Sequence, residues 1–386
     1  MTVVTSTVES PPEAPERDRP QFTDLATPLM LYAATRVVQL LFIVWMAPDG
    51  GPSVKDRLLA WDGGWFTRVA VEGYPHTYSY DGSGQMVGNG LAFFPAYPML
   101  IRGVHALGVE VGIAALSVSW LSGAVAAALL YLFGAELKDR RFGLALVVLF
   151  AAQPMSIVLS MGYSEGLFSV LVIGMFYAAY HRAFLTAGLL GLGAALTRPT
   201  GLAAAVGLAV AAVLAIHART VPRWRAVVGA LLALAGVPAY LLWVANRVGD
   251  LNAWFTIQTA GWGTTFDWGS STWNFLYVAF HQGNGWVQVS VALILVTAIV
   301  ATVLAIRRAW PPLTVYGLLA LVLVVGQAGS YHSKPRLLVP VLLTLIPAAY
   351  AAARARPAAA GLGLTAYAAF GLWYGAYMIT AWAYTI

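Results

Sequence analysis

Long apolar runs recur along almost the whole chain and are separated by short polar segments. Each run is roughly 17 to 22 residues long, enough for a helix to cross a bilayer core of about 30 Å. The hydropathy pattern therefore predicts an all-α polytopic membrane protein with about eleven spans. They are expected at residues 28–47, 111–133, 142–160, 165–181, 184–197, 200–216, 226–246, 286–306, 313–329, 337–353 and 358–381.

Two connections between the predicted spans are much longer than the others. They cover residues 48–110 and 247–285, and the even number of spans between them places both on one side of the membrane. Residues 1–24 are polar, acidic and rich in proline, and they lack the basic-then-apolar order of a signal peptide. We expect a disordered cytoplasmic tail over 1–24 and a single transmembrane domain over 25–386.

The predicted spans between residues 142 and 216 are short and interrupted by glycine and proline. The interruptions include Pro154, Gly162, Pro199 and Gly201. A break of this kind persists inside a membrane only where protein or a water-filled cavity satisfies the freed backbone groups. The pattern predicts a cavity near the outer leaflet. The chain shows no matched pair of broken helices in two halves, which is the usual sign of a transporter.

Composition agrees with a membrane protein, because 60% of residues are hydrophobic, 10% are charged and the mean hydropathy is +0.73. Cysteine is absent, which excludes disulfides and thiolate chemistry. The net charge of +6 does not indicate nucleic-acid binding, since the cations are scattered over short loops. A cytoplasmic N-terminus puts thirteen Lys and Arg residues in inner loops and eight in the longer outer segments, as the positive-inside rule requires.

A carboxylate among aromatics, in WDGGWFTRVAVEGYP at residues 61–75, is the first candidate for chemistry. In a helix over 58–70, Asp62 shares one face with four apolar residues: Leu58, Trp65, Phe66 and Val69. Apolar surroundings favour a protonated carboxyl and make it a usable proton acceptor. The alternative is an interfacial helix anchored by its tryptophans, with Asp62 as a cap or as the ion-pair partner of Arg57 or Arg68.

Four further motifs follow this one in a fixed order. They are LAFFPAYPML at 91–100, QPMSIVLSMGYSEGLF at 153–168, TRPTG at 197–201 and HSKPRLLVP at 332–340. Together, the five motifs resemble the GPI mannosyltransferase II (PIG-V-like) family of the GT-C superfamily. The resemblance implies a GT-C-like fold with interfacial helices in the first outer loop. It also implies inverting transfer of mannose from a polyprenyl-phosphate donor to a lipid-linked or glycan acceptor on the extracytoplasmic side, with Asp62 as general base.

The departing lipid phosphate requires cations on the same side of the membrane as the base. Pro335 favours an extended predecessor, and an extended segment would project His332, Lys334 and Arg336 to one side as donor-phosphate ligands. The alternative use of these cations is lipid-headgroup anchoring. Arg198 lies at a turn deep on the outer side, where substrate phosphate competes with Glu165 as its partner.

Several polar and aromatic residues are candidates for lining the substrate site. We expect this of Trp61, Trp65, Phe94, Tyr97, Tyr163 and Glu165. Glu165 has a commoner alternative use at a helix N-terminus. In the second long loop, a carbohydrate-facing surface or an interfacial aromatic belt accounts equally for Trp254, Gln258, Trp262, Trp268, Trp273 and Asn274. His76, Tyr78, Tyr80 and Asp81 in the first loop are candidates for the acceptor side, and a solvated loop is the default alternative.

The sequence contains no cluster with metal-ligand spacing and no nucleotide-binding fingerprint. We therefore predict no cofactor, metal-independent catalysis, and a lipid phosphate as the sugar carrier. The expected partners are membrane lipid, the polyprenyl-phosphate sugar and the acceptor, with no nucleic acid. Two alternatives stay open, namely a transporter or flippase of lipid-linked sugar, and a GT-C enzyme that uses another sugar or a protein acceptor.

Overall fold

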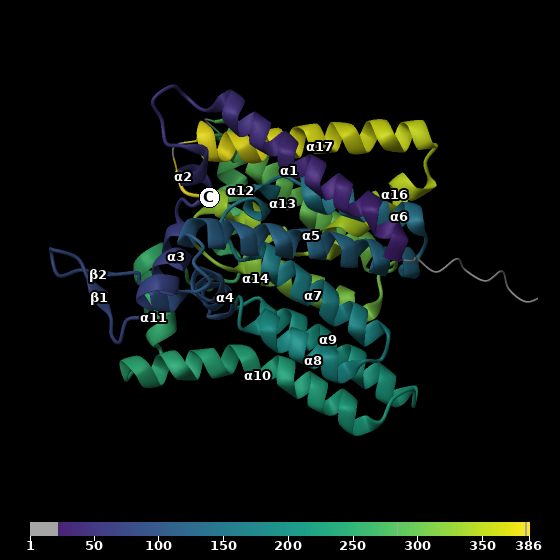
Figure 1. Ribbon diagram of the computed structural model, residues 1–386, viewed down its shortest axis with the longest axis horizontal. Coiled ribbons are helices and arrows are strands. Elements are labelled where there is room, and N and C mark those ends of the chain that lie inside the picture. The colour runs from purple at the N-terminus through teal and green to yellow at the C-terminus, as the bar shows by residue number, and fades with distance from the viewer. Residues whose placement is uncertain (1–21, 284, 383) are drawn as a thin grey trace, which may run out of the picture.

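The computed structural model describes residues 22–283, 285–382 and 384–386, and in these residues it is a helical bundle with one small β-hairpin (Figure 1). Most of the tail expected at residues 1–24 lies outside the described residues. The α-helices are α1 (Ala26–Met46), α2 (Val54–Leu58), α3 (Asp62–Glu72), α4 (Ala96–His105), α5 (Val111–Leu137), α6 (Arg140–Ala152), α7 (Glu165–Tyr180), α8 (Phe184–Ala195), α9 (Gly201–His217), α10 (Arg223–Val248), α11 (Ala253–Trp262), α12 (Ser270–His281), α13 (Trp286–Ala305), α14 (Pro311–Gly326), α15 (Lys334–Leu337), α16 (Ile346–Arg354) and α17 (Pro357–Thr380). The 3₁₀ helices are η1 (Phe22–Leu25), η2 (Gly90–Ala92), η3 (Ser156–Leu159), η4 (Tyr331–Ser333) and η5 (Leu342–Leu345), and the antiparallel strands are β1 (Ser79–Tyr80) and β2 (Met86–Val87).

The long apolar helices confirm the all-α polytopic membrane fold. Among the described residues, α1, α5, α10 and α13 are long and apolar enough to cross a membrane. The pair Tyr331–Leu337 and Leu342–Arg354, bent by 82°, adds a fifth span if it is counted as one. The helices α7, α8, α9 and α14 are apolar but have only 10–17 residues. The expected number of eleven spans is therefore not confirmed, although most of the expected ranges do coincide with helices.

The first break separates α6 from α7. The span expected over 142–160 ends at Ala152, because Pro154 keeps its predecessor extended and Met155 adopts a left-handed φ of 68°. Side chains from other helices bind the freed carbonyl groups. Arg36 of α1 donates from Nη1 to the Ser156 carbonyl oxygen at 2.9 Å and from Nη2 to that of Ala151. Trp120 of α5 donates to the Ser160 carbonyl oxygen at 2.7 Å. Protein thus supplies the partners that a membrane would lack.

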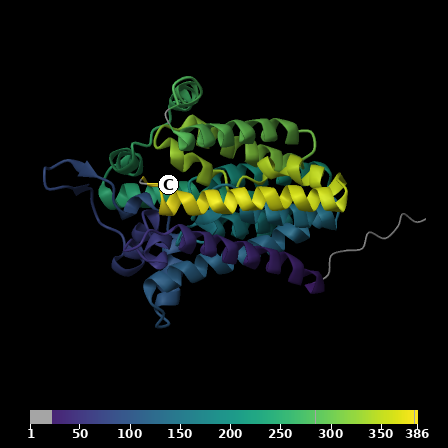
Figure 2. The ribbon, with the colours of Figure 1, turned by 90° about the horizontal axis from the view of Figure 1, so that it is seen from above.

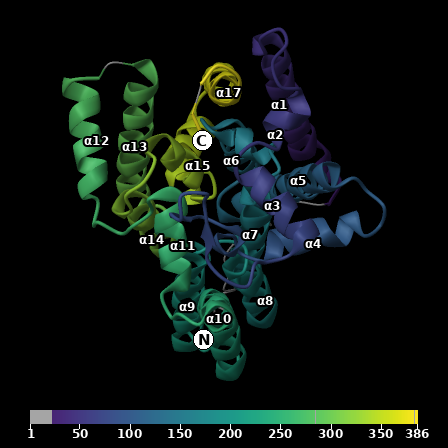
Figure 3. The same cartoon turned by 90° about the vertical axis from the view of Figure 1, so that its left-hand side faces the viewer.

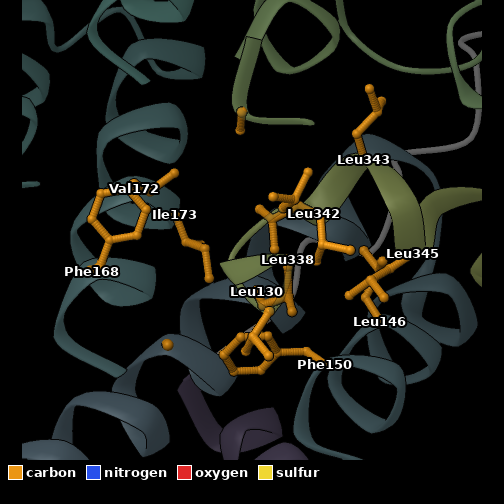
Figure 4. Close-up of a cluster of buried hydrophobic side chains, with 14 of the residues drawn as sticks. Leu130, Leu146, Phe150, Phe168, Val172, Ile173, Leu338, Leu342, Leu343 and Leu345 are labelled. Atoms are coloured by element: carbon orange, nitrogen blue, oxygen red, sulfur yellow. The ribbon is translucent and has the colours of Figure 1, made fainter. Parts of the chain in front are cut away.

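The second break lies between α14 and α16, where an unbroken span over 337–353 was expected. The segment that carries it is core: Leu338, Leu342, Leu343 and Leu345 pack among residues of α5, α6 and α7 (Figure 4). Its carbonyl groups are also bound, since Gln153 Nε2 lies 3.0 Å from the Val339 oxygen and Tyr316 Oη lies 3.0 Å from the Pro340 oxygen. The break is therefore a buried structural element, which hydropathy alone does not reveal.

The short helices α2, α3 and α4, the β-hairpin and α11 gather at one end of the bundle (Figures 1 and 2). Helix α10 fixes the loop that leads into η2. Tyr240 Oη donates to the carbonyl oxygens of Leu91 at 3.0 Å and Phe93 at 2.7 Å. Arg247 donates to the carbonyl oxygens of Tyr74 and Pro75, both at 2.7 Å. Helix α10 thus holds both ends of the segment between α3 and η2.

The close packing of α17 against the end of α6, where the first break begins, can be tested by substitution. A Cβ atom added at Gly371 would lie 1.9 Å from the Ala152 carbonyl oxygen. We expect Gly371→Ala to lower the free energy of unfolding by about 1–3 kcal/mol, because the helices must move apart. Gly361 of the same helix has no atom within 4 Å of its added Cβ. Gly361→Ala is therefore the matched control and should leave thermal unfolding in detergent unchanged or slightly improved. Equal behaviour of the two variants would contradict the packing argument.

Candidate functional site

Asp62 is the first residue of α3, and not the middle of a longer helix as expected. The helix predicted over 58–70 is interrupted after Leu58, because Trp61 adopts a φ of 54°. The next residue, Gly63, packs against the segment before α7, since a Cβ atom added to it would lie 3.5 Å from the Gly162 carbonyl oxygen. The carboxylate therefore sits at the positive end of the α3 dipole, where negative charge is favoured.

Arg336 is the ion-pair partner of Asp62. Its Nη1 lies 2.6 Å from Asp62 Oδ2, across 274 residues of sequence, and the two side chains are only 12% and 18% exposed. Arg57 and Arg68, the partners considered from sequence, are placed elsewhere. Arg57 donates to the Ile379 carbonyl oxygen at 2.9 Å, and Arg68 lies over the Trp65 ring.

Tyr163 lies beneath both members of this pair. The Arg336 guanidinium carbon is 5.2 Å from the centroid of its ring, and its hydroxyl oxygen accepts from the Asp62 backbone N–H at 3.4 Å. The side chain is fully buried. Burial, and then the neighbouring Asp62 carboxylate, raise the pKa of the Tyr163 phenol, so the phenol stays neutral. Tyr163 is a fixed support for the pair.

A second ion pair lies close to the first. Arg198, in the turn between α8 and α9, places Nη1 2.6 Å from Glu165 Oε1 and 3.1 Å from Ser164 Oγ. Glu165 is the first residue of α7 and is 1% exposed. It therefore both pairs with Arg198 and complements the helix dipole. Two partners were considered for Arg198 from sequence, Glu165 and a substrate phosphate, and in the structure Arg198 pairs with Glu165.

The ion pairs border a cavity of about 340 Å³. Asp62, Arg198, Lys334 and Arg336 line it, together with Trp61, Trp65 and Phe94. Three other expected lining residues are not in its wall. Tyr97 and Tyr163 are fully buried, Glu165 is 1% exposed, and Tyr97 Oη is occupied by the Ala115 carbonyl oxygen at 2.8 Å. These three form the layer behind the wall.

The three cations of HSKPR do not converge as expected. The segment is helical and not extended, since η4 ends at Ser333 and Pro335 occupies the first turn of α15, where its fixed φ suits a helix start. Lys334 Nζ donates to the Val324 carbonyl oxygen at 3.0 Å and also to that of Gln327. His332 is outside the cavity wall and packs against Tyr331 and Trp382. Only Lys334 and Arg336 line the cavity.

The second long loop divides into two parts. Trp254, Gln258 and Trp262 line the cavity, whereas Trp268 and Trp273 are 87% and 73% exposed and lie outside its wall.

The cavity also has a polar wall that was not expected from sequence, formed by Thr197, Thr264, Gln327, Ser330 and Ser333. The run GQAGSYHS just before Lys334, between apolar segments, was the available signal. Tyr78 of the hairpin instead donates to Asp250 at 2.5 Å.

The sequence predicted no metal site, and it offered His76, Tyr78, Tyr80 and Asp81 as candidates for the acceptor side. In the part of the chain that the structure describes, no three His, Asp or Glu side chains come together as a metal site. Metal-independent catalysis stays a prediction. His76, Tyr80 and Asp81 lie, like Tyr78, outside the cavity wall.

No known protein family and no curated protein matches the sequence. The fold, however, is similar to solved membrane glycosyltransferases. ArnT from Cupriavidus metallidurans bound to undecaprenyl phosphate gives a TM-score of 0.53 at 15% identity, covering 89% of this chain and 64% of that one. The Archaeoglobus fulgidus oligosaccharyltransferase in its apo form gives 0.52 at 12% identity, covering 92% and 56%. The chain has the GT-C fold. It spans less than two thirds of either structure, and the narrower PIG-V-like family stays a prediction.

The buried pair Arg198–Glu165 gives a test of how the site is held. Arg198→Met leaves the Glu165 carboxylate buried without its charge partner, which we expect to cost roughly 3 kcal/mol of stability. Adding Glu165→Gln should restore most of that loss, as a double-mutant cycle of unfolding in detergent will show. The control is Lys55→Met, which breaks an exposed pair with Glu110 and should cost less than about 1 kcal/mol. A double variant no more stable than Arg198→Met would contradict the pairing.

Proposed function

We propose that the protein is a membrane glycosyltransferase that transfers mannose from a polyprenyl-phosphate donor to a hydroxyl of a lipid-linked or glycan acceptor. The observation that carries this proposal is the Asp62–Arg336 pair in the wall of a cavity within a GT-C fold. The ArnT structure is bound to undecaprenyl phosphate, a carrier of the class proposed here. The motif resemblance supports mannose as the sugar.

Asp62 is the proposed general base. Arg336 holds Oδ2, and Oδ1 accepts no hydrogen bond from a described residue, which leaves it for the acceptor. Oδ1 takes the proton of the acceptor hydroxyl while that oxygen attacks the anomeric carbon. The bond from the anomeric carbon to the phosphate oxygen breaks on the opposite face, its electron pair leaves with the lipid phosphate, and the configuration inverts.

The leaving phosphate gains negative charge as this bond breaks. Arg198, Lys334 and the N–H groups of Arg336 not used by Asp62 are the proposed donors, since all three side chains line the cavity. Lys334 is fixed by two carbonyl groups and Arg198 by Glu165, so these cations need little reorganisation. His332 has no place in this site.

An apolar groove next to the cavity is the proposed seat of the polyprenyl chain. It has a volume of about 290 Å³ and is lined by Phe266, Trp268, Ile299, Leu321, Val322, Val325 and Gly326. Phe266 forms an isolated antiparallel bridge with Gln327, which lines the cavity. This adjacency lets one lipid place its chain in the groove and its phosphate in the cavity.

The proposed orientation puts the cavity on the extracytoplasmic side. Figure 1 shows α3, α11 and the hairpin at one end of the bundle, and the first residues of α1 at the other. Arg140, the first residue of α6, pairs with Asp24 just before α1 and therefore lies at this second end. This separation supports the charge distribution expected from the positive-inside rule.

The decisive experiment measures mannosyl transfer in proteoliposomes from polyprenyl-phosphate mannose. Asp62→Asn should reduce the rate by at least about 10²-fold, because the base is lost. It also leaves the mostly buried Arg336 without its charge partner, so a loss of stability is expected as well and is measured by thermal unfolding in detergent. Asp81→Asn, in the exposed turn of the hairpin, is the matched control and should keep full activity.

Undiminished transfer by Asp62→Asn would remove the proposed base. Movement of the donor across the membrane by the wild type, without a new glycosidic bond, would favour the transporter. A lipid acceptor and an acceptor peptide should be supplied in parallel, since one of the oligosaccharyltransferase structures holds a tethered acceptor peptide at a TM-score of 0.50.

A further inference from the structure

Helix α11 presents one continuous strip to the cavity. Trp254, Gln258 and Trp262 are spaced by four residues, so they share one face of the helix, and all three line the cavity. Figure 3 looks onto the end of the bundle where α11 and α3 lie. The proposed mechanism uses none of these three residues, and their function is open.

The orientation of the Gln258 amide follows from its neighbours. Its Nε2 donates to the Ala92 carbonyl oxygen at 3.1 Å, and the Trp254 indole N–H donates to the same oxygen at 3.3 Å. A carbonyl oxygen accepts and cannot donate, so the NH₂ end of the amide must face Ala92. Oε1 therefore points away from Ala92, and it accepts no hydrogen bond from the described residues. Gln258 offers the cavity a fixed acceptor.

Aromatic rings line the same cavity as this acceptor. Trp262, Trp65 and Phe93 form a cluster in which the ring centroids are 5.4–6.1 Å apart. All three line the cavity, and neither indole N–H bonds to a described residue. Rings with a polar edge and an apolar face suit a ligand that has the same two properties. A hexose has hydroxyl groups at its edge and C–H groups on its faces.

The strip is held rigidly against the first long loop. A Cβ atom added at Gly88 would lie 2.7 Å from both Gly261 Cα and the Trp262 ring. This contact leaves no room for a side chain at Gly88, so the end of α11 is locked to the segment after β2. A recognition group on a fixed element loses less entropy when the ligand binds.

We propose that the α11 strip recognises the hexose ring carried by the donor, and that Gln258 is a specificity-determining residue whose Oε1 accepts a hydrogen bond from one sugar hydroxyl. This inference rests on the proposed function. The donor sugar is covalently bound to a phosphate that must reach Arg198 and Arg336 in the same cavity, so its ring is confined there. The acceptor need bring only one hydroxyl to Asp62.

The test compares kcat/KM for polyprenyl-phosphate mannose and for its monodeoxy analogues. The wild type should use one deoxy analogue about three- to tenfold less well because the Gln258 hydrogen bond is lost. In Gln258→Met, a substitution of similar size, kcat/KM for the parent donor should fall by the same factor, and the penalty for that one analogue should disappear. If Gln258→Met keeps the wild-type loss in kcat/KM for every deoxy analogue, the proposal is wrong.

Two measurements separate this role from a merely structural one. Trp254→Phe removes the other donor to the Ala92 carbonyl oxygen and should keep the discrimination against the deoxy analogue. If Trp254→Phe loses this discrimination, the effect belongs to the loop that carries Ala92 and not to Gln258. In an Asp62→Asn background, which prevents turnover, Gln258→Met should weaken binding of polyprenyl-phosphate mannose and leave binding of bare polyprenyl phosphate unchanged. Binding is measured here without transfer. The result therefore tests sugar recognition by the α11 strip separately from the proposed transferase activity.

Discussion

The ion pair between Asp62 and Arg336 is the interaction on which the site depends. In a chain with only 10% charged residues, two opposite charges 274 positions apart lie within 2.6 Å of each other while mostly buried. Burying two charges is costly unless their geometry is good and their remaining hydrogen-bonding groups have partners. The fold brings the two charges together by ending α2 at Leu58, with Trp61 at a positive φ, so that α3 starts at Asp62, and by bending the later segment just after Arg336.

Breaks in the helical structure carry all the charged residues of the site. Asp62 follows the strained Trp61, Glu165 follows η3, Arg198 lies in the turn between two short helices, and Arg336 lies in the bent segment. An unbroken span would face lipid along its length and could not gather charges from several helices. Each break frees backbone carbonyl groups, and in a membrane these need protein partners. The side chains that supply them, Arg36, Trp120, Gln153 and Tyr316, are therefore as necessary to the site as its charged residues.

Hydropathy predicted most helices within a few residues, because the apolar runs are long and their polar boundaries are sharp. It could not predict the bend between η4 and α16, since a buried broken segment and a straight span are equally apolar. The motifs predicted Asp62, Arg198, Lys334 and Arg336, which the structure brings to one cavity. The pairing of Asp62 with Arg336, and the burial of Tyr163 behind them, depend on contacts between distant segments. Local spacing contains no information on these contacts.

Charge balance in the cavity connects the fold to the chemistry. Arg198, Lys334 and Arg336 place three cationic side chains in the cavity wall, and Asp62 and Glu165 pair with the two arginines. A polyprenyl-phosphate sugar is a phosphodiester with one negative charge, which suits a wall rich in cations. Breaking the sugar–phosphate bond creates a monoester with more negative charge, and donors already fixed in place stabilise that change without reorganising. Tyr163, whose phenol stays neutral, adds no charge beneath the Asp62–Arg336 pair.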